Sequence, residues 1–404
     1  MNPKSLGLVI AKLRKQRGLT QFKLAEKLNV SDKAVSRWES GIGFPEVTLF
    51  PELAKALGVS VDFLMTGERK GIAVAGSIIT DIVKTIDFFP KQGMLANISD
   101  IKKAVGGCAP NTAIDLAKID HTIPLSVIGK IGDDEYGRFI LSELSKQGID
   151  CSQVSVSPNN YTSFCDVMSL PSGERTFFHK RGTNADFSPS DIDLSRLNCV
   201  MLHIGYLMLL DNFDKADDTY GTVMARFLHD VKQQGIKTSV DLISQDTPDY
   251  AKTVIHSLKY CDYIIVNEIE SSMVSGIDAY NEDGSLNTQN VKKTCEFLAG
   301  KGVSEKVIIH CKQAGFCYDV PTKKFTMVPS LKIPKDKIKG SVGAGDAFCA
   351  GALYAIYNGY EDTAMLEFAS AAAACNLFSS SSTEGMKSKD EIITLPNIYG
   401  RQTV

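Results

Sequence analysis

Short apolar runs that alternate with helical stretches are the feature that most constrains the fold of this chain. The runs are only three to five residues long and cover residues 72–76, 200–204, 238–242, 263–266 and 307–309. Helical patterns lie between them, at 111–118, 220–234 and 290–301. Strands that alternate with helices favour right-handed β-α-β units. The pattern therefore predicts an α/β domain with a doubly wound, mainly parallel sheet.

One part of this region departs from the alternation. Residues 162–170 and 175–180 flank the turn Pro171-Ser172-Gly173-Glu174, a pattern typical of a β-hairpin. Antiparallel ribbons attached to such sheets often close over a bound ligand. We expect this hairpin to project from the sheet as a small β lid.

The first seventy residues contain helical patterns alone. Apolar residues recur at helical spacing up to Gly18, and two short helices follow at 21–28 and 32–39, with Thr20 and Ser31 as their caps. Two helices joined by a tight turn describe a helix-turn-helix, whose second helix enters the major groove of DNA. Two more helices complete this small all-α domain, at 49–57 and 61–64.

Charge is divided unevenly between the two parts of the chain. Residues 1–70 carry 12 Lys/Arg against 7 Asp/Glu, a net +5, whereas the remaining residues carry a net −8 and the whole chain −3. A modest positive excess is commonly a solvated face, so it supports nucleic-acid binding only where a docking motif accompanies it. The helix-turn-helix pattern supplies that motif.

The amino-acid sequence of this region matches one particular type of helix-turn-helix. LTQFKLAEKLNVSDKAVSRWESG, followed by FPELAKALGVSVDFLMTG, resembles the phage-repressor type of helix-turn-helix, the XRE family, over residues 5–67. The resemblance implies a domain over residues 1–68 that binds double-stranded DNA. It also implies a homodimer, because such modules read paired half-sites. A dimerisation element that binds no DNA is the alternative.

The same resemblance assigns residues to the DNA interface. Gln21 would contact a phosphate, and the groove would be faced by Asp32, Lys33, Ser36 and Arg37. Lys and Arg suit guanine edges, whereas Asp suits a cytosine amine or a helix-capping role, and we favour capping for Asp32. The exposed Lys33 and Arg37 favour DNA binding over dimerisation alone.

The stretch GSVGAGDAFC, residues 340–349, marks the candidate active site. Gly343, Ala344 and Gly345 stand between an expected strand end at 332–334 and an expected helix at 347–357. Backbone N–H groups at such a junction attract a phosphate. A phosphate would repel the carboxylate of Asp346 unless a proton or a metal offsets its charge. The presence of this carboxylate therefore suggests chemistry, such as removing a proton from an attacking hydroxyl. From this stretch alone, an N-capping role for Asp346 is equally compatible.

Three further elements favour the chemical interpretation: Asp81 soon after the first strand, a Gly pair at 106–107 followed by Asn111, and Asn267-Glu268-Ile269-Glu270 after a strand end. Together with the stretch from Gly343 to Asp346, they make four motifs that follow one another along the chain. This set resembles the ribokinase-like, phosphofructokinase-B family of carbohydrate and nucleoside kinases. The resemblance implies a kinase domain over residues 70–396 that phosphorylates a sugar hydroxyl with ATP.

The kinase resemblance implies a role for each motif. Asp346 would be the catalytic base, and the N–H groups of Gly343, Ala344 and Gly345 the anion hole. Magnesium and nucleotide phosphates would be positioned by Asn267 and by Glu270, the latter through water, and a monovalent cation is a further candidate. The sugar would be held by Asp81, Gly106, Gly107, Asn111 and Arg181. Arg181 and Asn184 match the segment after the lid that often contacts substrate, and the alternative for this pair is a lid-base salt bridge and a turn.

Two departures from the family pattern leave an alternative open. Gly340 and Ser341 stand where the family has Asp or Asn followed by Thr, and His310-Cys311-Lys312 stands in place of Thr-Leu-Gly. Lys312 could reach a nucleotide phosphate or obstruct ATP. The alternative function is a transcription regulator whose silent kinase-like domain senses a sugar or a nucleotide. The acceptor, a sugar or a nucleoside, is not determined by the motifs.

Other site classes are disfavoured. The ten cysteines form no C-x-x-C pair, which predicts buried thiols. The longest apolar run, 199–210, is too short to span a membrane, and the N-terminus lacks the pattern of a secretory signal, so we expect a cytoplasmic protein. His310 is expected to be a strand-end residue, and no pairing typical of a triad or metal site is expected for His121, His179, His203, His229 and His256.

Overall fold

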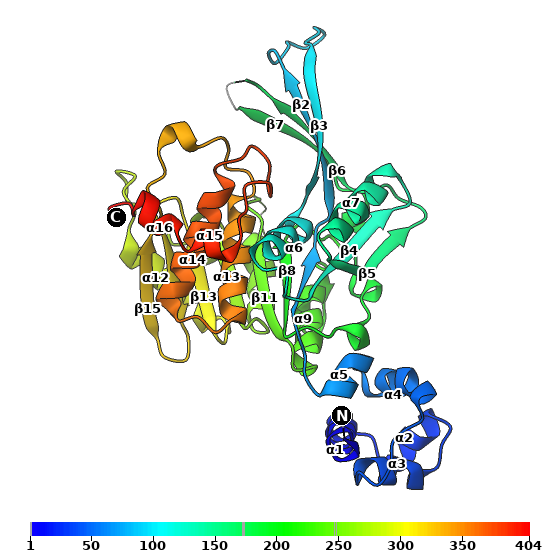
Figure 1. Ribbon diagram of the computed structural model, residues 1–404. Helices are drawn as coiled ribbons and strands as arrows, with labels where there is room; N and C mark the ends of the chain where they lie inside the picture. The colour runs from blue at the N-terminus through cyan, green and yellow to red at the C-terminus, as the bar shows by residue number, and fades with distance from the viewer. Residues whose placement is uncertain (1, 172–173, 246, 248) are drawn as a thin grey trace.

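A nine-stranded sheet organises the larger part of the molecule (Figure 1). The computed structural model describes residues 2–171, 174–245, 247 and 249–404. Seven neighbouring strands run parallel, and β14 and β15 add an antiparallel edge, which confirms the mainly parallel sheet. In spatial order the strands are β15 (Lys324–Pro329), β14 (Ala314–Asp319), β13 (Lys306–His310), β12 (Tyr263–Asn267), β11 (Lys237–Leu242), β8 (Met201–Leu207), β1 (Ile72–Gly76), β4 (Leu125–Gly132) and β5 (Asp150–Ser157).

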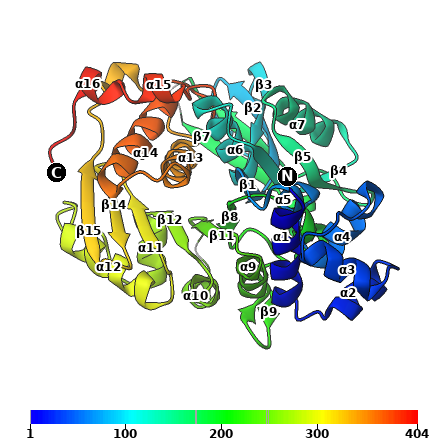
Figure 2. The ribbon, with the colours of Figure 1, turned by 60° about the horizontal axis from the view of Figure 1, so that its bottom comes forward.

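Helices cover both faces of this sheet (Figure 2). The central strands are therefore buried on both sides, which explains their uninterrupted apolar runs. One face packs against α6 (Cys108–Ile119), α7 (Glu135–Lys146), α13 (Ala344–Tyr357) and α14 (Asp362–Asn376). The other face packs against α9 (Val223–Gln233), α10 (Tyr250–Leu258), α11 (Glu268–Ser275) and α12 (Thr288–Gly300).

Short elements complete the α/β domain. Near the C-terminus lie α15 (Lys389–Ile392) and α16 (Leu395–Tyr399). The connections contain α8 (Thr183–Asp186), η2 (Pro189–Asp191), η3 (Leu194–Arg196), β9 (Ala216–Asp217), β10 (Gly221–Thr222) and η4 (Lys335–Lys337).

A second sheet projects from the α/β domain, and we call its four strands the lid (Figure 1). They are β3 (Ile98–Gly106), β2 (Ile79–Ile86), β6 (Phe164–Ser169) and β7 (Arg175–Lys180). The expected hairpin is present as β6 and β7, and Ser172 and Gly173 of its turn lie outside the described residues. Strands β2 and β3 were not expected, because β3 is exposed over most of its length and so lacks an apolar face.

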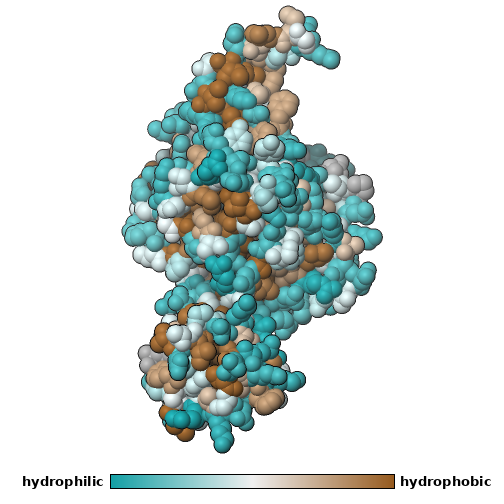
Figure 3. Space-filling view, turned by 90° about the vertical axis from the view of Figure 1, so that its right-hand side faces the viewer, coloured by the Kyte–Doolittle hydropathy of each residue, from teal (hydrophilic) through white to brown (hydrophobic). Residues whose placement is uncertain are grey.

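The lid leaves large apolar side chains in contact with solvent. Figure 3 shows them gathered on the projecting part of the molecule. The exposed residues are Phe88, Phe89, Met94, Leu95, Ile98, Ile101, Phe177 and Phe178. An exposed apolar group of this size is unusual on a monomer and is typical of a surface that contacts another molecule.

Five helices form the N-terminal domain, as expected from the sequence. They are α1 (Pro3–Gln16), α2 (Gln21–Lys27), α3 (Asp32–Glu39), α4 (Phe50–Leu57) and α5 (Val61–Thr66), with the short η1 (Val47–Leu49) before α4. The Thr20 hydroxyl accepts the Lys23 N–H and the Ser31 hydroxyl accepts the Ala34 N–H, so both predicted caps are present. The core of this domain includes Trp38, which is 6 % exposed.

Two arginines join the N-terminal domain to the α/β domain. The Arg17 guanidinium donates to the Gln234 side-chain oxygen at 2.7 Å, and that of Arg69 donates to the Gln234 carbonyl oxygen at 3.0 Å. Gln234 caps the C-terminal end of α9. The N-terminal domain and the lid lie at opposite ends of the α/β domain (Figure 1).

Two expectations about the GSVGAGDAFC region need correction. Residues 332–334 do not end a strand: Leu331 forms only an isolated bridge with Arg401, and the chain then turns, because the Ile333 N–H bonds to the Leu331 carbonyl and Pro334 has no N–H to donate. Helix α13 begins at Ala344, three residues earlier than expected. Asp346 therefore lies inside the first helical turn.

Two expectations about composition can also be checked. Among the described residues, no helix has the length and apolarity needed to cross a membrane. All ten cysteines lie in the described part of the chain as free thiols, and eight of them are buried, as predicted.

Candidate active site

The start of α13 places Asp346 in the wall of a small cavity. Gly343, which precedes the helix, has a φ of +79°, a conformation that favours glycine. A Cβ atom at Gly343 would lie 2.6 Å from the Ser382 carbonyl oxygen, so the turn also has no room for a larger residue. The Asp346 side chain, two residues into the helix, is buried and lines the cavity.

The same helix start presents backbone N–H groups to the cavity. Gly343 and Gly345 line it, and within the described residues their N–H groups have no hydrogen-bond partner. The Ala344 N–H donates to the Ser341 carbonyl oxygen at 3.2 Å and is occupied in this conformation. Free N–H groups at a helix N-terminus bind anions. The site can therefore receive a phosphate at Gly343 and Gly345.

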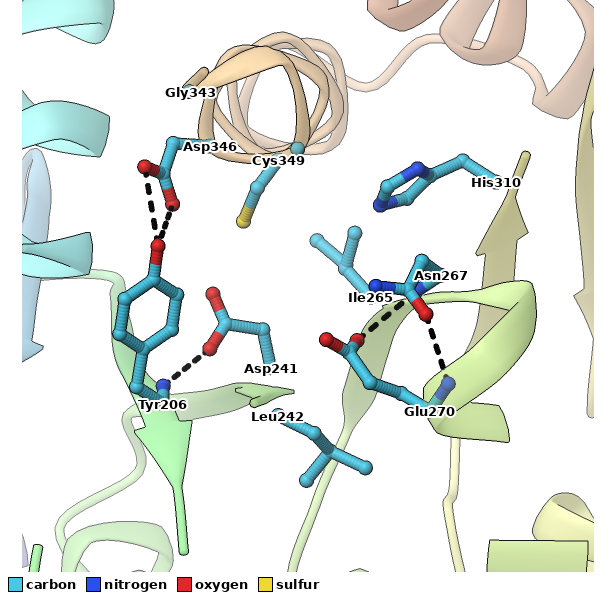
Figure 4. Close-up of a pocket in the computed structure, with 11 residues that line it drawn as sticks. Tyr206, Asp241, Leu242, Ile265, Asn267, Glu270, His310, Gly343, Asp346 and Cys349 are labelled. Atoms are coloured by element: carbon cyan, nitrogen blue, oxygen red, sulfur yellow. Dashed lines mark hydrogen bonds between the residues drawn. The ribbon is translucent and has the colours of Figure 1, made fainter. Parts of the chain in front are cut away.

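Two side chains hold the Asp346 carboxylate in place. The Asn111 amide donates to Oδ2 at 2.8 Å, and the Tyr206 hydroxyl lies 3.1 Å from Oδ1 and 3.3 Å from Oδ2 (Figure 4 shows the tyrosine contact). Burial raises the pKa of Asp346 to about 7, and the nearby Asp241 and Asp81 carboxylates add to this, whereas the two hydrogen bonds oppose it. A carboxyl group with a pKa near neutrality suits a general base.

Two adjoining cavities meet at the start of α13, and Asp346 lines the smaller of them. The smaller has a volume of about 150 Å³, and the polar side chains that line it around Asp346 include Tyr206, Asp241, Asn267, Glu270 and His310 (Figure 4). The larger has a volume of about 990 Å³ and shares Asn267, His310 and Gly345 with the smaller one. A cavity of this size accommodates a nucleotide-sized ligand.

Asn267 and Glu270 stand together at the start of α11. The Asn267 side chain accepts the Glu270 N–H at 2.8 Å, and the Glu270 carboxylate accepts the Asn267 N–H at 3.1 Å. Burial raises the pKa of Glu270 to about 8. A bound cation would favour its charged form, and the carboxylate and amide oxygens in this cavity fit a magnesium ion that retains part of its water.

The residues expected to hold a sugar lie on the lid side of Asp346. Asp81 is part of β2, and a Cβ atom at Gly106 would lie 2.2 Å from its Oδ2 atom. Gly107, with a φ of +89°, caps the helix that carries Asn111. Burial raises the pKa of Asp81 to about 6. The fold thus brings these four residues to one side of Asp346, and Asn111 bonds to it directly.

Comparison with known proteins agrees with this arrangement. Residues 69–389, which make up most of the chain, match the sequence profile of the pfkB family carbohydrate kinases. The chain belongs to the pfkB family of carbohydrate kinases. Residues 10–64 match a family of helix-turn-helix domains, so a DNA-binding type of domain precedes the kinase domain.

Individual relatives of this pfkB-family kinase are distant. A 5-dehydro-2-deoxygluconokinase of Clostridium tetani is 26% identical over 76% of this chain and 89% of the relative. A protein of the same name from Shouchella clausii is 23% identical over 72% and 86%. The solved structure of Arabidopsis thaliana ribokinase complexed with ribose and ATP superposes with a TM-score of 0.65 at 20% identity, over 81% of this chain and 98% of that one. That likeness establishes the ribokinase-like fold.

Three further predicted residues of the kinase domain have clear positions. Arg181 forms a salt bridge with Asp211 at the base of the lid. Asn184 is buried, where its side chain accepts the Ile78 N–H and donates to the Ser77 hydroxyl, so it fixes the chain between β1 and β2. Lys312 lines the 990 Å³ cavity. Only Lys312 of these three lines one of the two cavities.

His310 lies between the two cavities of the kinase domain. Its ring stacks on Phe348, with 4.6 Å between the centroids. Burial lowers the pKa of His310 to about 4, so the ring is uncharged at neutral pH. As expected, it occupies the end of a strand, and its uncharged ring lines both cavities.

Tyr206 and Asp241 were missed by sequence reasoning. Tyr206 has a φ of +58°, a region that costs a non-glycine residue about 1–3 kcal/mol and is often found at functional sites. Its N–H donates to an Asp241 oxygen and its hydroxyl to Asp346 (Figure 4). No local motif marks either residue, because β8 and β11 become neighbours only in the folded sheet.

For His203 the sequence predicted no pairing typical of a triad or metal site, and the structure gives this histidine two polar neighbours. Its Nε2 atom lies 3.3 Å from Asp241 Oδ2, and its Nδ1 atom lies 3.0 Å from the Ser239 hydroxyl. His203 is fully buried inside an apolar strand. A polar residue within the run 199–210 was the available signal, since buried polar groups require partners.

The helix-turn-helix domain exposes the residues predicted to face DNA. Asp32, Lys33, Ser36 and Arg37 are all exposed on α3. Asp32 accepts the Lys33 N–H at 2.8 Å, in line with a local capping role. The Gln21 amide instead donates to Glu39 at 2.8 Å, so its contact with a phosphate stays a prediction.

Proposed function

We propose that this pfkB-family kinase transfers the terminal phosphoryl group of ATP to a sugar hydroxyl, with Asp346 as general base. The observation that carries the proposal is the shared cavity of the Asp346 carboxylate and the free N–H groups of Gly343 and Gly345. A base and an anion site side by side are the parts that phosphoryl transfer to a hydroxyl requires.

The two sides of Asp346 would take different substrates. The nucleotide would occupy the 990 Å³ cavity, with Lys312 near its phosphates and the terminal phosphoryl group at Gly343 and Gly345. The sugar would lie on the lid side, against Asp81, Gly106, Gly107 and Asn111. The lid would exclude water, which otherwise competes as acceptor.

In the reaction, the sugar hydroxyl would replace the Tyr206 hydroxyl at the Asp346 carboxylate. The hydroxyl oxygen bonds to the terminal phosphorus as the bond from phosphorus to the ADP oxygen breaks, and the hydroxyl proton passes to Asp346. The free N–H groups stabilise the charge of the transferring group. A magnesium ion held through Asn267 and Glu270 supplies charge neutralisation for the phosphates when bound.

A panel of acceptors tests this proposal. The first acceptor to try is 5-dehydro-2-deoxygluconate, after the name shared by the C. tetani and S. clausii relatives, followed by ribose, fructose and nucleosides. We expect ADP release, with magnesium, to depend on one of these acceptors. Phosphorylated product must appear in equal amount, because ADP release alone would equally report hydrolysis of ATP.

A sensor without turnover is the second candidate function. The observation that favours it is the contact of the Tyr206 hydroxyl with Asp346, which occupies the base, together with Lys312 at the nucleotide cavity. In that case no acceptor would support turnover, but a sugar would still raise the melting temperature. The effect on DNA binding would then be the output of the kinase-like domain.

The pH profile of kcat/KM tests the role of Asp346. Since burial raises its pKa to about 7, and only the carboxylate form accepts a proton, we expect kcat/KM to fall about tenfold per pH unit below pH 7 and to level off above it. Burial also raises the pKa of Glu270 to about 8. The inflection near pH 7 should therefore persist in Glu270→Gln, and a profile without it would contradict the assignment.

We also propose that the N-terminal domain binds DNA as part of a homodimer, with α3 in the major groove. Lys33→Ala and Arg37→Ala should each weaken binding by about 1–3 kcal/mol, the usual value of a lost base contact. The measurement is a titration against duplexes that wild-type protein enriches from a random pool. Lys55→Ala is the matched control, because Lys55 is exposed with the same charge but lies on α4. Equal losses in all three variants would mean that α3 does not read the DNA.

A further inference from the structure

Three buried side chains at the proposed catalytic cavity form a group to which the proposed reaction assigns no bond-making step. His203 comes from β8, Asp241 from β11 and Cys349 from α13. They are 0 %, 7 % and 2 % exposed. One nitrogen, oxygen or sulfur atom of each lies within 4.8 Å of the others. In Figure 4, Asp241 enters the cavity from β11 and Cys349 enters it from α13.

The two separations that involve His203 match the edges of a metal tetrahedron. His203 Nε2 lies 3.3 Å from Asp241 Oδ2 and 3.5 Å from Cys349 Sγ. Around a tetrahedral zinc ion, ordinary bond lengths place a nitrogen about 3.3 Å from an oxygen and about 3.5 Å from a sulfur. Both distances are therefore those expected if His203 shares one bound ion with Asp241 and with Cys349.

Neighbouring groups orient the same three atoms. The Ser239 hydroxyl lies 3.0 Å from His203 Nδ1 and can accept its proton, which leaves Nε2 with a free electron pair. The Tyr206 N–H donates to Asp241 Oδ1, so Oδ2 remains directed at His203. Metal-binding histidines commonly have such a partner on the second ring nitrogen.

We propose that His203, Asp241 and Cys349 bind a divalent transition-metal ion of the zinc type, with a fourth position open to the 150 Å³ cavity. Thiolate and imidazole ligands select zinc, cobalt or iron over magnesium, which prefers oxygen ligands. The cavity, lined by Asp241 and Cys349, provides the route of entry. On binding, the Cys349 thiol loses its proton to solvent as the metal–sulfur bond forms, so affinity rises with pH.

The competing explanation is a metal-free hydrogen-bonded network. His203 would then donate from Nε2 to Asp241 and accept the Ser239 hydroxyl at Nδ1, and the Cys349 thiol would only fill space. Such a network needs no ion to satisfy its buried polar groups. The two explanations differ in whether the Cys349 thiol becomes a metal-bound thiolate when metal is added.

Cobalt(II) is the probe that separates them, because a cobalt–thiolate bond has an intense near-ultraviolet charge-transfer band and tetrahedral cobalt absorbs in the visible. The full chain, reduced and freed of metal with a chelator, is titrated with CoCl₂. We expect both sets of bands to saturate at one equivalent and to disappear when ZnCl₂ is added. A spectrum equal to that of free cobalt would overturn the proposal.

Variants assign the ligands and control for the other thiols. Cys349→Ser should remove the charge-transfer band and weaken cobalt binding by more than about 100-fold. Ser239 contacts the proposed ligand His203 and is not itself a ligand, so Ser239→Ala should weaken cobalt binding about 10- to 100-fold. Cys311→Ser is the matched control, since this thiol belongs to the neighbouring cavity. Circular dichroism checks the fold of each variant, and Ser239→Ala decides the question if Cys349→Ser does not fold. Bands that survive in Cys349→Ser, or that are lost in Cys311→Ser, would refute the site.

Discussion

Replacement of Asp346 by Asn should lower kcat by about 10²–10⁴-fold, the usual contribution of a general base. The change removes only the ability to accept a proton. Asn retains an oxygen that can accept the hydrogen bonds now donated by Asn111 and Tyr206. The free N–H groups of Gly343 and Gly345 are unchanged, so nucleotide affinity should remain close to that of the wild type.

The measurement is ADP formation with the acceptor identified from the panel, alongside ATP affinity by calorimetry. Asp390→Asn is the matched control, since Asp390 is exposed on α15 and outside both cavities. A variant that keeps more than about one tenth of wild-type kcat would exclude Asp346 as the base. A loss of ATP binding together with kcat would instead indicate that the N-terminus of α13 had been disturbed.

Asp346→Asn should also change the stability of the protein, and the pKa of Asp346 determines whether stability rises or falls. The pKa of Asp346 in the folded protein, about 7, lies above that of an unfolded aspartate. The folded state therefore binds the proton more tightly, and stability from this group is lost as pH rises from about 4 to 7. Asp346→Asn should consequently melt higher than wild type at pH 8, and the difference should shrink toward pH 4.

Replacement of Arg14 by Ala should strongly destabilise the helix-turn-helix domain and leave the kinase domain intact. The Arg14 guanidinium is buried, where it donates to both Glu39 oxygens at 2.5 and 2.8 Å and to the Leu19 carbonyl oxygen at 2.7 Å. Removal of one partner from a buried ion pair costs about 3–5 kcal/mol, because the other charge is left without compensation. A domain of this size has little more stability than that to lose.

The chain offers a direct readout for this prediction. Trp38 is the single tryptophan of the sequence and lies in the core of the helix-turn-helix domain, so its fluorescence reports the unfolding of that domain alone. We expect the Trp38 transition in denaturant to move to much lower concentration in Arg14→Ala, with DNA binding lost and kinase activity kept. The neighbouring exposed residue supplies the control, Lys15→Ala. A Trp38 transition within about 1 kcal/mol of wild type would contradict the expected role of the ion pair.

The fold could be predicted where local sequence patterns decide the structure. Caps at Thr20 and Ser31 and continuous apolar runs such as 263–266 gave helices and strands within a few residues of their observed bounds. The prediction failed where long-range contacts decide. Strand β3 is held by its pairing with β2 rather than by an apolar face, and the segment 332–334 is shaped by contacts with residues 400–402.

The candidate site divides in the same way. Asp346 belongs to one short motif, and Asn267 and Glu270 belong to another. The residues of each motif are close together along the chain, so a resemblance could place them. Tyr206 and Asp241 are 35 residues apart and meet through a single hydrogen bond between two neighbouring strands. Only the pairing of β8 with β11, in the observed register, brings them to Asp346.

The opposite placement of the lid and the helix-turn-helix domain limits how two copies can hold DNA (Figure 1). Contact between copies through the exposed apolar side of the lids would carry the two α3 helices to the far ends of the pair. Adjacent half-sites one helical turn apart, about 34 Å, would then be out of reach of such a pair. Pairing through the lid would instead tie together two separate operators and fold the DNA between them into a loop.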